Sequence, residues 1–378
     1  MNLYLVDGNS YVYRAFYAIK GLSNSKGFPT NAIYGFTNML LKILRGKKPD
    51  GIVVSFDSPV PTERHRMFDA YKAQRPETPA ELVRQLPHIR KLITAFNITI
   101  FETPGYEADD LLCTIARRAE QEGANVFIVT SDKDMLQIVD EKIKVYDPVK
   151  DRVLDEEYVK EKFGLAPERV PEVMALTGDA VDNIPGVKGI GEKTAEELLA
   201  GFRNLDELLS SPAKIKKEKL RNLIIENKEL IRLSRQLATV NTSVPIEIDL
   251  KEFLVREPDW SSLLPLFREF EFGSLMKMIP SAKSERRYET VLSMERFREL
   301  ISSMSHGFAF VIEATGRDAL EDTVIGLAVS TQEGKASYLP FSHLYKNAPP
   351  QIDKKEALRL ASALFENAEI PKTGHNLK

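Results

Sequence analysis

The sequence predicts an α/β protein of two or three domains that begins with a parallel sheet covered by helices on both faces. Five short apolar runs typical of strands, at residues 2–6, 51–56, 97–101, 125–130 and 143–146, alternate with segments of helical periodicity. The chain has 378 residues, more than one ordinary domain contains, and 43% of them are hydrophobic, which is enough for a substantial core.

The connecting segments differ in character along the chain. AIYGFTNMLLKIL (residues 32–44) and ADDLLCTIARRAEQEG (residues 108–123) have helix spacing. Residues 58–86 are rich in charge and proline, and they predict a loop or helical excursion over the sheet. From about residue 165 to 278 the pattern is mostly helical, and SAKSERR (residues 281–287) is polar enough to predict a linker.

The last segment resembles a separate small domain. Residues 307–341 predict antiparallel strands with turns, and KKEALRLASALFEN (residues 354–367) predicts a helix after them. The chain then stops at KTGHNLK without a natural end signal. We therefore expect the last domain to be incomplete.

Composition restricts the class of protein. The net charge is only −3, so a nucleic-acid-binding face would require local clustering of basic residues. The single cysteine, Cys113, allows no disulfide within the chain, fits a reducing compartment and predicts a small core side chain. No apolar run is long enough for a membrane span, and the N-terminus has no basic signal-peptide region. These features predict a cytoplasmic protein.

Acidic residues follow the predicted strands and open a predicted helix. Asp7 and Asp57 each close an apolar run, and VFIVTSDKD leads to two more aspartates. Because the carboxyl ends of parallel strands meet at one edge of a sheet, we expect these side chains to gather there. The candidate carboxylates are Asp7, Asp57, Glu107, Asp109, Asp110, Asp132, Asp134, Asp179 and Asp182.

Carboxylates packed this densely repel one another, and hard divalent cations bound through oxygen would stabilise them. The pattern predicts two Mg²⁺ or Mn²⁺ ions about 3.5–4 Å apart, which together activate a water and stabilise both oxygens of an in-line displacement at phosphorus. The alternative is that these residues are helix caps and loop residues. It is as good for any single residue but weaker for the whole set. The five histidines show no zinc spacing.

A glycine-containing motif follows the last pair of aspartates. In PGVKGIGEKTAEELL (residues 185–199) two glycine turns lead directly into a helix, where exposed N–H groups can hold a phosphate without reading a base. The alternative is a plain helical connection with glycine caps. The residues that we expect to contact DNA here are Gly186, Lys188, Gly189, Gly191, Lys193 and Thr194.

Basic residues cluster in the excursion over the sheet. Lys72 and Arg75 in YKAQR are about one helical turn apart and could offset the growing charge of a reacting phosphate. Arg64 is a further candidate for contact with DNA. Tyr13 and Arg14 could touch a terminal nucleotide, with buried packing of Tyr13 as an equal alternative.

Six motifs in this order resemble a known family. VDGNSYVYRAFYA, FD at 56–57, YKAQR, YEADD, SDKDMLQIV and TGDAVDNIPGVKGIGEKTA are similar to the 5′-nuclease domain of bacterial DNA polymerase I, a relative of the flap endonucleases. The resemblance runs from residue 1 to about 278. It implies a PIN-like core (1–165) with a helical arch (about 58–86), followed by a helix–three-turn–helix DNA-binding region (166–280).

The resemblance also implies roles for the candidate residues. The nine carboxylates correspond to the family's metal ligands, and Lys72 and Arg75 correspond to the cations of its arch. It further implies a monovalent cation, K⁺, at the glycine hairpin, held by the backbone near Val187 and Ile190.

Residues 288–378 resemble the 3′-5′ exonuclease-like domain, of RNase H-like fold, that follows in polymerase I. Where active members have an Asp-x-Glu pair, this chain has Val311, Ile312 and Glu313. A valine cannot bind Mg²⁺, so we expect this partial domain to have no proofreading activity.

Together these features predict a structure-specific 5′ nuclease that cuts DNA at 5′ flaps, nicks or overhangs and removes RNA primers from DNA hybrids. The products would be a 5′-phosphate and a 3′-hydroxyl. We expect a monomer in the bacterial cytoplasm, joined in the full-length protein to a polymerase domain that this chain lacks. The alternatives are a non-cleaving module that binds branched DNA, a scaffold for a polymerase, and a PIN-type ribonuclease. The acidic set argues against a pure binder, which gains nothing from carboxylates facing a polyanion.

Overall fold

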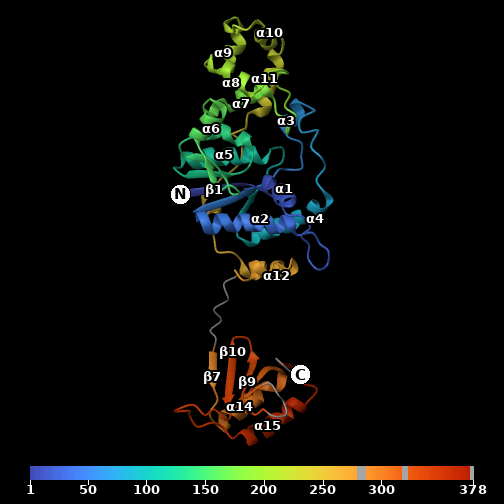
Figure 1. Ribbon diagram of the computed structural model, residues 1–378, viewed down its shortest axis with the longest axis vertical. Coiled ribbons are helices and arrows are strands. Elements are labelled where there is room, and N and C mark those ends of the chain that lie inside the picture. The colour runs from blue at the N-terminus through green and yellow to red at the C-terminus, as the bar shows by residue number, and fades with distance from the viewer. Residues whose placement is uncertain (279–286, 317–321, 375–378) are drawn as a thin grey trace. The chain divides into compact units, whose positions relative to one another are not determined.

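The computed structural model describes residues 1–278, 287–316 and 322–374 (Figure 1). The chain divides into two compact units, Met1–Ile279 and Pro280–Lys378. Residues 281–286 of the expected linker and His375 lie outside the described residues. No helix within the described ranges is both long and apolar enough to cross a bilayer.

The first unit is built on a six-stranded sheet in the order β3-β2-β1-β4-β5-β6. The strands are β1 (Asn2–Asp7), β2 (Gly51–Ser55), β3 (Thr99–Phe101), β4 (Asn125–Val129), β5 (Ile143–Asp147) and β6 (Arg152–Leu154). The first five are parallel, which confirms the predicted strands, and β6 pairs antiparallel with β5 at the edge. The three-residue β6 was not predicted, because so short a run gives no periodic signal.

Helices cover both faces of this sheet (Figure 1). They are α1 (Gly8–Ala18), α2 (Asn31–Lys42), α3 (Glu63–Met67), α4 (Ala80–Ala95), α5 (Ala108–Gln121) and α6 (Glu156–Phe163). Alternate residues of β1 point to opposite faces, so Leu3 and Leu5 join the core beneath α5, and Tyr4 and Val6 join the core beneath α2 and α4. Cys113 is fully buried in the first of these cores, as predicted.

The helical region after the sheet contains α7 (Val170–Thr177), α8 (Glu192–Ala200), α9 (Leu205–Ser210), α10 (Glu218–Glu226) and α11 (Lys228–Ala238). We expected one helical region over 166–280, but its last part returns to the α/β core. Helix α12 (Trp260–Glu269) packs on α4, and α13 (Gly273–Met276) follows it. The buried side chains of Leu263 and Phe267 explain this return, because they complete the core beneath α2 and α4.

The second unit has its own sheet and core. Its strands β7 (Arg287–Thr290), β8 (Phe308–Ala314), β9 (Val324–Gln332), β10 (Lys335–Pro340) and β11 (Lys372–Gly374) lie in the order β11-β8-β9-β10-β7. Strand β9 is antiparallel to both neighbours, as the sequence predicts. Helices α14 (Met294–Ser303) and α15 (Lys354–Glu366) add Phe297, Leu300, Ala357 and Ala361 to this core.

The strand order of the first unit determines where a site can form. From β1 the chain builds β2 and β3 on one side and then crosses to β4 and β5 on the other. In doubly wound sheets ligands bind outside the carboxyl ends of the strands at such a switch point. Asp7 is the last residue of β1, and Asp132 follows β4 by three residues.

Candidate metal centre

The carboxylates that follow β1 and β2 are held by local hydrogen bonds. Asp7 caps α1, accepting from the Ser10 N–H at 2.9 Å, and its other oxygen accepts from the Thr130 hydroxyl at 2.8 Å. Asp57 accepts from the Asn9 amide at 2.6 Å and from the Ala108 N–H at 2.8 Å. These bonds tie the ends of β1, β2 and β4 to the start of α5.

Neighbouring acids make it harder for Asp7 and Asp109 to ionise at this edge. The pKa of Asp7 is raised to about 7, chiefly by burial and also by the charges of Asp57 and Asp132, while hydrogen bonds from Ser10 and Thr130 lower it. Burial also raises the pKa of Asp109 well above its usual range, and Asp7 and Asp132 add to this effect. The ionised forms of Asp7 and Asp109 are therefore unfavourable on their own. A bound cation would stabilise them by reducing the repulsion between the carboxylates.

A second group of acids surrounds the short helix after β4. Asp132 caps this helix (Lys133–Ile138) by accepting from the Asp134 N–H at 2.9 Å. The pKa of Asp134 is raised to about 8, chiefly by burial and also by the charges of Asp132, Asp182 and Asp179. In the described structure the buried Oδ1 of Asp134 has no hydrogen-bond partner. The charge of Asp132 thus raises the pKa of Asp7 in the first group and of Asp134 in the second.

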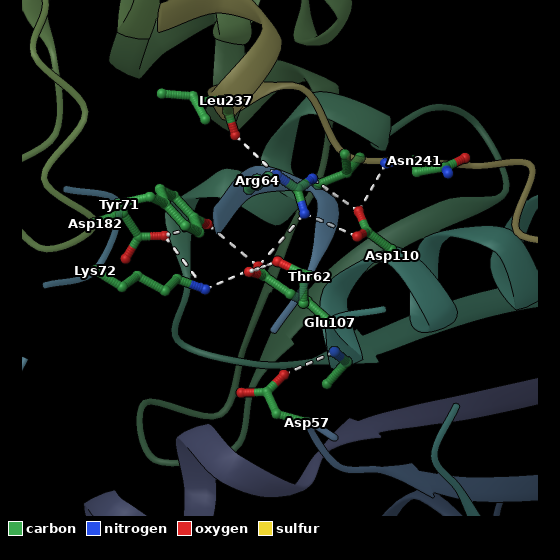
Figure 2. A network of polar contacts seen from close by, with 12 residues as sticks. Asp57, Thr62, Arg64, Tyr71, Lys72, Glu107, Asp110, Asp182, Leu237 and Asn241 are labelled. Carbon is green, nitrogen blue, oxygen red and sulfur yellow. Dashed lines mark hydrogen bonds and ion pairs between the residues drawn. The ribbon is translucent and has the colours of Figure 1, made fainter. Parts of the chain in front are cut away.

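Cationic side chains hold several of these acids (Figure 2). Lys72 Nζ lies 2.8 Å from Glu107 Oε2 and 3.6 Å from Asp182 Oδ2. Arg75 pairs with Asp182 at 2.6 Å, and Lys133 pairs with Asp179 at 2.7 Å.

The backbone holds Lys72 in this position. Its φ angle is 56°, a left-handed value that few side chains adopt, and its N–H donates to the Asp182 carbonyl at 3.0 Å. The predicted arch segment is therefore docked on the acidic edge by both its charge and its backbone.

Glu107 shows how these cations act. Burial opposes ionisation of Glu107, but Lys72 and Arg64 outweigh that effect and keep its pKa below the usual value. The hydroxyls of Tyr71 and Thr62 also donate to it, at 3.2 and 3.3 Å. Glu107 is therefore charged in a buried position and can exchange a lysine for another cation.

Arg64 and Asp110 form a buried ion pair (Figure 2). We had expected Arg64 to contact DNA and Asp110 to bind a metal ion. The guanidinium binds both oxygens of Asp110 at 2.8 Å and donates to the carbonyls of Leu237 and Thr239 at 3.0 and 2.9 Å. Asp110 also accepts from the Asn241 N–H at 2.8 Å. Arg64 is only 8% exposed, so little of its side chain is accessible to a ligand. Asp110 has its oxygens engaged and serves as a link between α3, α5 and the end of α11.

The chemistry of this donor set fits hard divalent cations. It offers only oxygen, it includes an orphaned buried atom on Asp134, and its charges repel one another. In the described ranges no three His, Cys, Asp or Glu side chains are grouped closely enough to hold a metal ion as they stand. Lys72, Arg75 and Lys133 take up carboxylate oxygens that an ion would share.

The glycine hairpin divides into a buried and an exposed part. Gly186 is buried with φ 57°, and a Cβ there would lie 2.2 Å from the Gly178 nitrogen. Lys188, Gly189, Gly191 and Lys193 are exposed, and Thr194 is half-buried at the start of α8. The hairpin thus presents two lysines, while Gly186 acts through packing. The Ile190 N–H donates to the Val187 carbonyl at 3.0 Å, within the backbone proposed for K⁺.

Tyr13 and Arg14 lie on α1 beside this edge. The Tyr13 hydroxyl is 2.5 Å from that of Thr78 and its ring packs on the core beneath α2, so packing accounts for at least part of its role. Arg14 is half-buried and lines a cavity described below.

Sequence reasoning missed the side chains that bind the acids directly. They are Asn9, Thr62, Tyr71, Thr130 and Lys133. Tyr71 and Lys133 each stand next to a residue that the sequence singled out, and this adjacency was an available signal. Nothing local distinguishes Thr62, which lies 45 positions from its partner Glu107.

Comparison with known proteins identifies the family. The family model for the 5′-3′ exonuclease N-terminal resolvase-like domain matches residues 2–164, and that for the 5′-3′ exonuclease C-terminal SAM fold matches residues 165–261. A 5′-3′ exonuclease of Aquifex aeolicus is 40% identical over 277 residues, which make up 73% of this chain and 94% of the relative. The chain belongs to the 5′-3′ exonuclease family.

Longer relatives of this 5′-3′ exonuclease family member are DNA polymerases. DNA polymerase I of Bacillus caldotenax is 38% identical over 359 residues, or 93% of this chain and 40% of the relative. DNA polymerase I of Pseudomonas aeruginosa is 37% identical and matches 100% of this chain and 44% of its own length. The chain therefore spans less than half of these relatives.

Solved structures share the fold of the first unit. A bacteriophage T5 5′-exonuclease with bound zinc matches with a TM-score of 0.55 at 20% identity, covering 72% of this chain and 99% of that one. The catalytic core of Rad2 in complex with DNA matches with a TM-score of 0.52 at 20% identity, covering 74% of this chain and 91% of that one.

Removing Arg64 should destabilise the first unit. We expect Arg64→Ala to lower the free energy of unfolding by about 3–5 kcal/mol, because Asp110 is left buried without its partner. Urea unfolding measures this loss. Arg66→Ala, on the exposed face of the same helix, is the control and should change stability by less than about 0.5 kcal/mol. Equal effects of the two variants would contradict the role given to Arg64.

Gly186 should be more sensitive than its neighbour Gly191. We expect Gly186→Ala to cost about 3 kcal/mol, since the residue needs a positive φ and its Cβ would clash with backbone. Gly191→Ala should be tolerated, because its φ is −98° and a Cβ there meets nothing within 4 Å. Thermal unfolding of both variants tests the difference, and matching melting temperatures would show that the hairpin is not tightly packed.

Proposed function

We propose that the first unit is a metal-dependent, structure-specific 5′ nuclease that cuts a phosphodiester near a 5′ flap, nick or overhang. The observation that carries this proposal is the set of buried, mutually repelling carboxylates at the switch point of the sheet. Membership of the 5′-3′ exonuclease family supports it.

We assign Asp7, Asp57, Glu107 and Asp109 to one cation and Asp134, Asp179 and Asp182 to the other, with Asp132 between them. Two Mg²⁺ or Mn²⁺ ions bound there would activate a water and neutralise charge on the reacting phosphate. Asp110 keeps α5 in place through Arg64. From the sequence we counted Asp110 among the metal ligands, but in the structure its oxygens are already bonded.

Lys72 and Arg75 are the cations closest to the reacting phosphate in this proposal. When carboxylates turn toward a divalent ion, Lys72 is released from Glu107 and Asp182 and can donate to a phosphate oxygen. Arg75, whose side chain is 43% exposed, can present two N–H groups to the same phosphate. The predicted arch segment, which carries Lys72 and Arg75, would then stabilise the negative charge of the transition state.

The exposed hairpin lysines, Lys188 and Lys193, hold the duplex through its backbone and add no base specificity. The proposed substrates include RNA primers paired to DNA, because contacts to a phosphate backbone do not depend on the bases. In a full-length protein like the polymerase I relatives, a polymerase domain would follow, and the nuclease would work beside it as a monomer. The proposed K⁺ would sit at the hairpin backbone near Val187.

We also propose that the second unit is a 3′-5′ exonuclease-like domain of RNase H-like fold without proofreading activity. Strand β8 is antiparallel to β9 and parallel to β11, which agrees with that fold. At the place of the metal-binding pair, β8 has Val311 and Ile312, which are 43% and 50% exposed, followed by Glu313. The pair therefore lacks one of its two carboxylates.

Asp134→Asn should abolish cleavage of a labelled 5′-flap DNA in Mg²⁺ while DNA affinity stays near normal. The orphaned carboxylate is placed to bind an ion, and an amide binds Mg²⁺ poorly. Product formation and a gel-shift titration measure the two quantities, and Asp69→Asn, an exposed aspartate in the excursion, is the control.

Turnover by Asp134→Asn would remove this residue from the site. Intact wild-type substrate in both Mg²⁺ and EDTA would favour a DNA-binding module without nuclease activity. Preference for single-stranded RNA over the flap would favour a ribonuclease.

Lys72→Ala should slow cleavage of the same flap by about 10²–10³-fold, the usual effect of removing one group that stabilises transition-state charge. Substrate affinity should change little, because Lys72 is 12% exposed before the site opens. Single-turnover rates test this, with Lys91→Ala, an exposed lysine on α4, as the control. A Lys72→Ala rate within threefold of wild type would exclude the residue from the mechanism.

A further inference from the structure

A basic cavity continues the acidic edge of the first unit. It has a volume of about 260 Å³ and begins at Asp132. The cationic side chains along its wall are Arg14, Lys133, Lys150, Arg152 and Lys162. Among the described residues, the only other acid that lines it is Asp147, whose Oδ1 accepts hydrogen bonds from the backbone N–H groups of Val149 and Lys150. The cavity therefore carries a clear excess of positive charge.

Four of these cations are not neutralised by an acid. In the described part of the chain, Arg14, Lys150, Arg152 and Lys162 form no ion pair, whereas Lys133 pairs with Asp179. Asp151, which precedes Arg152, is turned to another partner and pairs with Lys47 at 2.7 Å. Unpaired cations gathered around one cavity repel one another, so a bound anion would stabilise them.

Aromatic rings hold two of the cations in place without cancelling their charge. The Arg152 guanidinium lies 4.5 Å from the centre of the Tyr158 ring, and Lys162 Nζ lies 4.9 Å from that of Phe163. A ring face orients a cation but leaves its N–H groups open at the edge. These side chains are thus positioned to bind an anion.

The location of the cavity identifies the anion. The acids that follow β1, β2 and β4 lie at the carboxyl edge, and Asp147 and Arg152 belong to β5 and β6, the next strands along that edge. Asp132 itself lines the cavity, so the cavity borders the proposed cleavage centre, and Arg152 on β6 is two strands, or about 10 Å, from β4. A strand placed across the acids would bring its neighbouring phosphate to the basic cavity.

We propose that this cavity binds the phosphodiester next to the scissile one on the cleaved DNA strand, and so fixes which linkage reaches the acids. The proposal rests on the proposed nuclease function of the first unit. It assigns binding to Lys150, Arg152 and Lys162, none of which the family motifs or the acidic edge point to. One neutralised phosphate contact should reduce the dependence of log K on log salt by about 0.7–0.9.

The test combines protein variants that lack cavity side chains with DNA in which a single phosphate is neutral. DNA affinity is measured in EDTA, so that no cleavage occurs, for wild type and for Arg152→Ala/Lys162→Ala, with Lys160→Ala as a control. Lys160 is on the same helix α6, pairs with Glu156, and does not line the cavity. Each protein is titrated with a 5′-flap DNA and with versions that carry one neutral methylphosphonate on either side of the cleavage position.

We expect the double variant to bind the unmodified flap about tenfold more weakly, with a smaller salt dependence. One methylphosphonate should weaken wild type and the control by a similar factor but leave the double variant unaffected, because the contact is already lost. Unchanged affinity of the double variant, or equal further loss for every methylphosphonate, would overturn the proposal. These affinities are measured without metal, so they do not depend on whether the wild type cleaves the flap. Failure of this proposal can therefore be distinguished from failure of the proposed nuclease function.

Discussion

Repulsion between buried carboxylates is the constraint on which the rest of the first unit depends. Parallel strands bring Asp7 and the residues after β4 to one edge, and burial there raises the pKa of Asp7 to about 7 and that of Asp134 to about 8. Such buried charges destabilise the fold unless cations bind to the carboxylates. The sheet order, the helix caps and the docked excursion all serve to keep these acids together.

The protein supplies some of that positive charge itself. Lys72 pairs with Glu107, Lys133 pairs with Asp179, and Arg64 pairs with Asp110. A lysine pair can be replaced by a metal ion more easily than the Arg64 pair. Arg64 donates to both oxygens of Asp110 and to two backbone carbonyls, whereas a lysine is a single point charge. Exchange of lysines for metal ions would therefore leave α3 and α5 in place while freeing the arch segment to meet the substrate.

Much of this arrangement follows from the sequence, because apolar runs that end in aspartate specify both a strand and the edge at which its acid lies. The five parallel strands were predictable from their apolar runs, and three of these runs lead directly into Asp7, Asp57 and Asp132. Arg64 was not, since its partners Asp110 and Leu237 are 46 and 173 positions away and no local pattern reports such distant contacts. The return of α12 to the sheet was missed because a helix pattern shows an apolar face but not what covers it.

A crystal structure of the first unit with Mn²⁺, located by anomalous scattering, tests the central claim most directly. The account predicts two ions at the carboxyl edge, both reached by Asp132, with Lys72 and Lys133 displaced from their carboxylates. Ions bound elsewhere, or an edge in which Lys72 still pairs with Glu107 at saturating Mn²⁺, would contradict it.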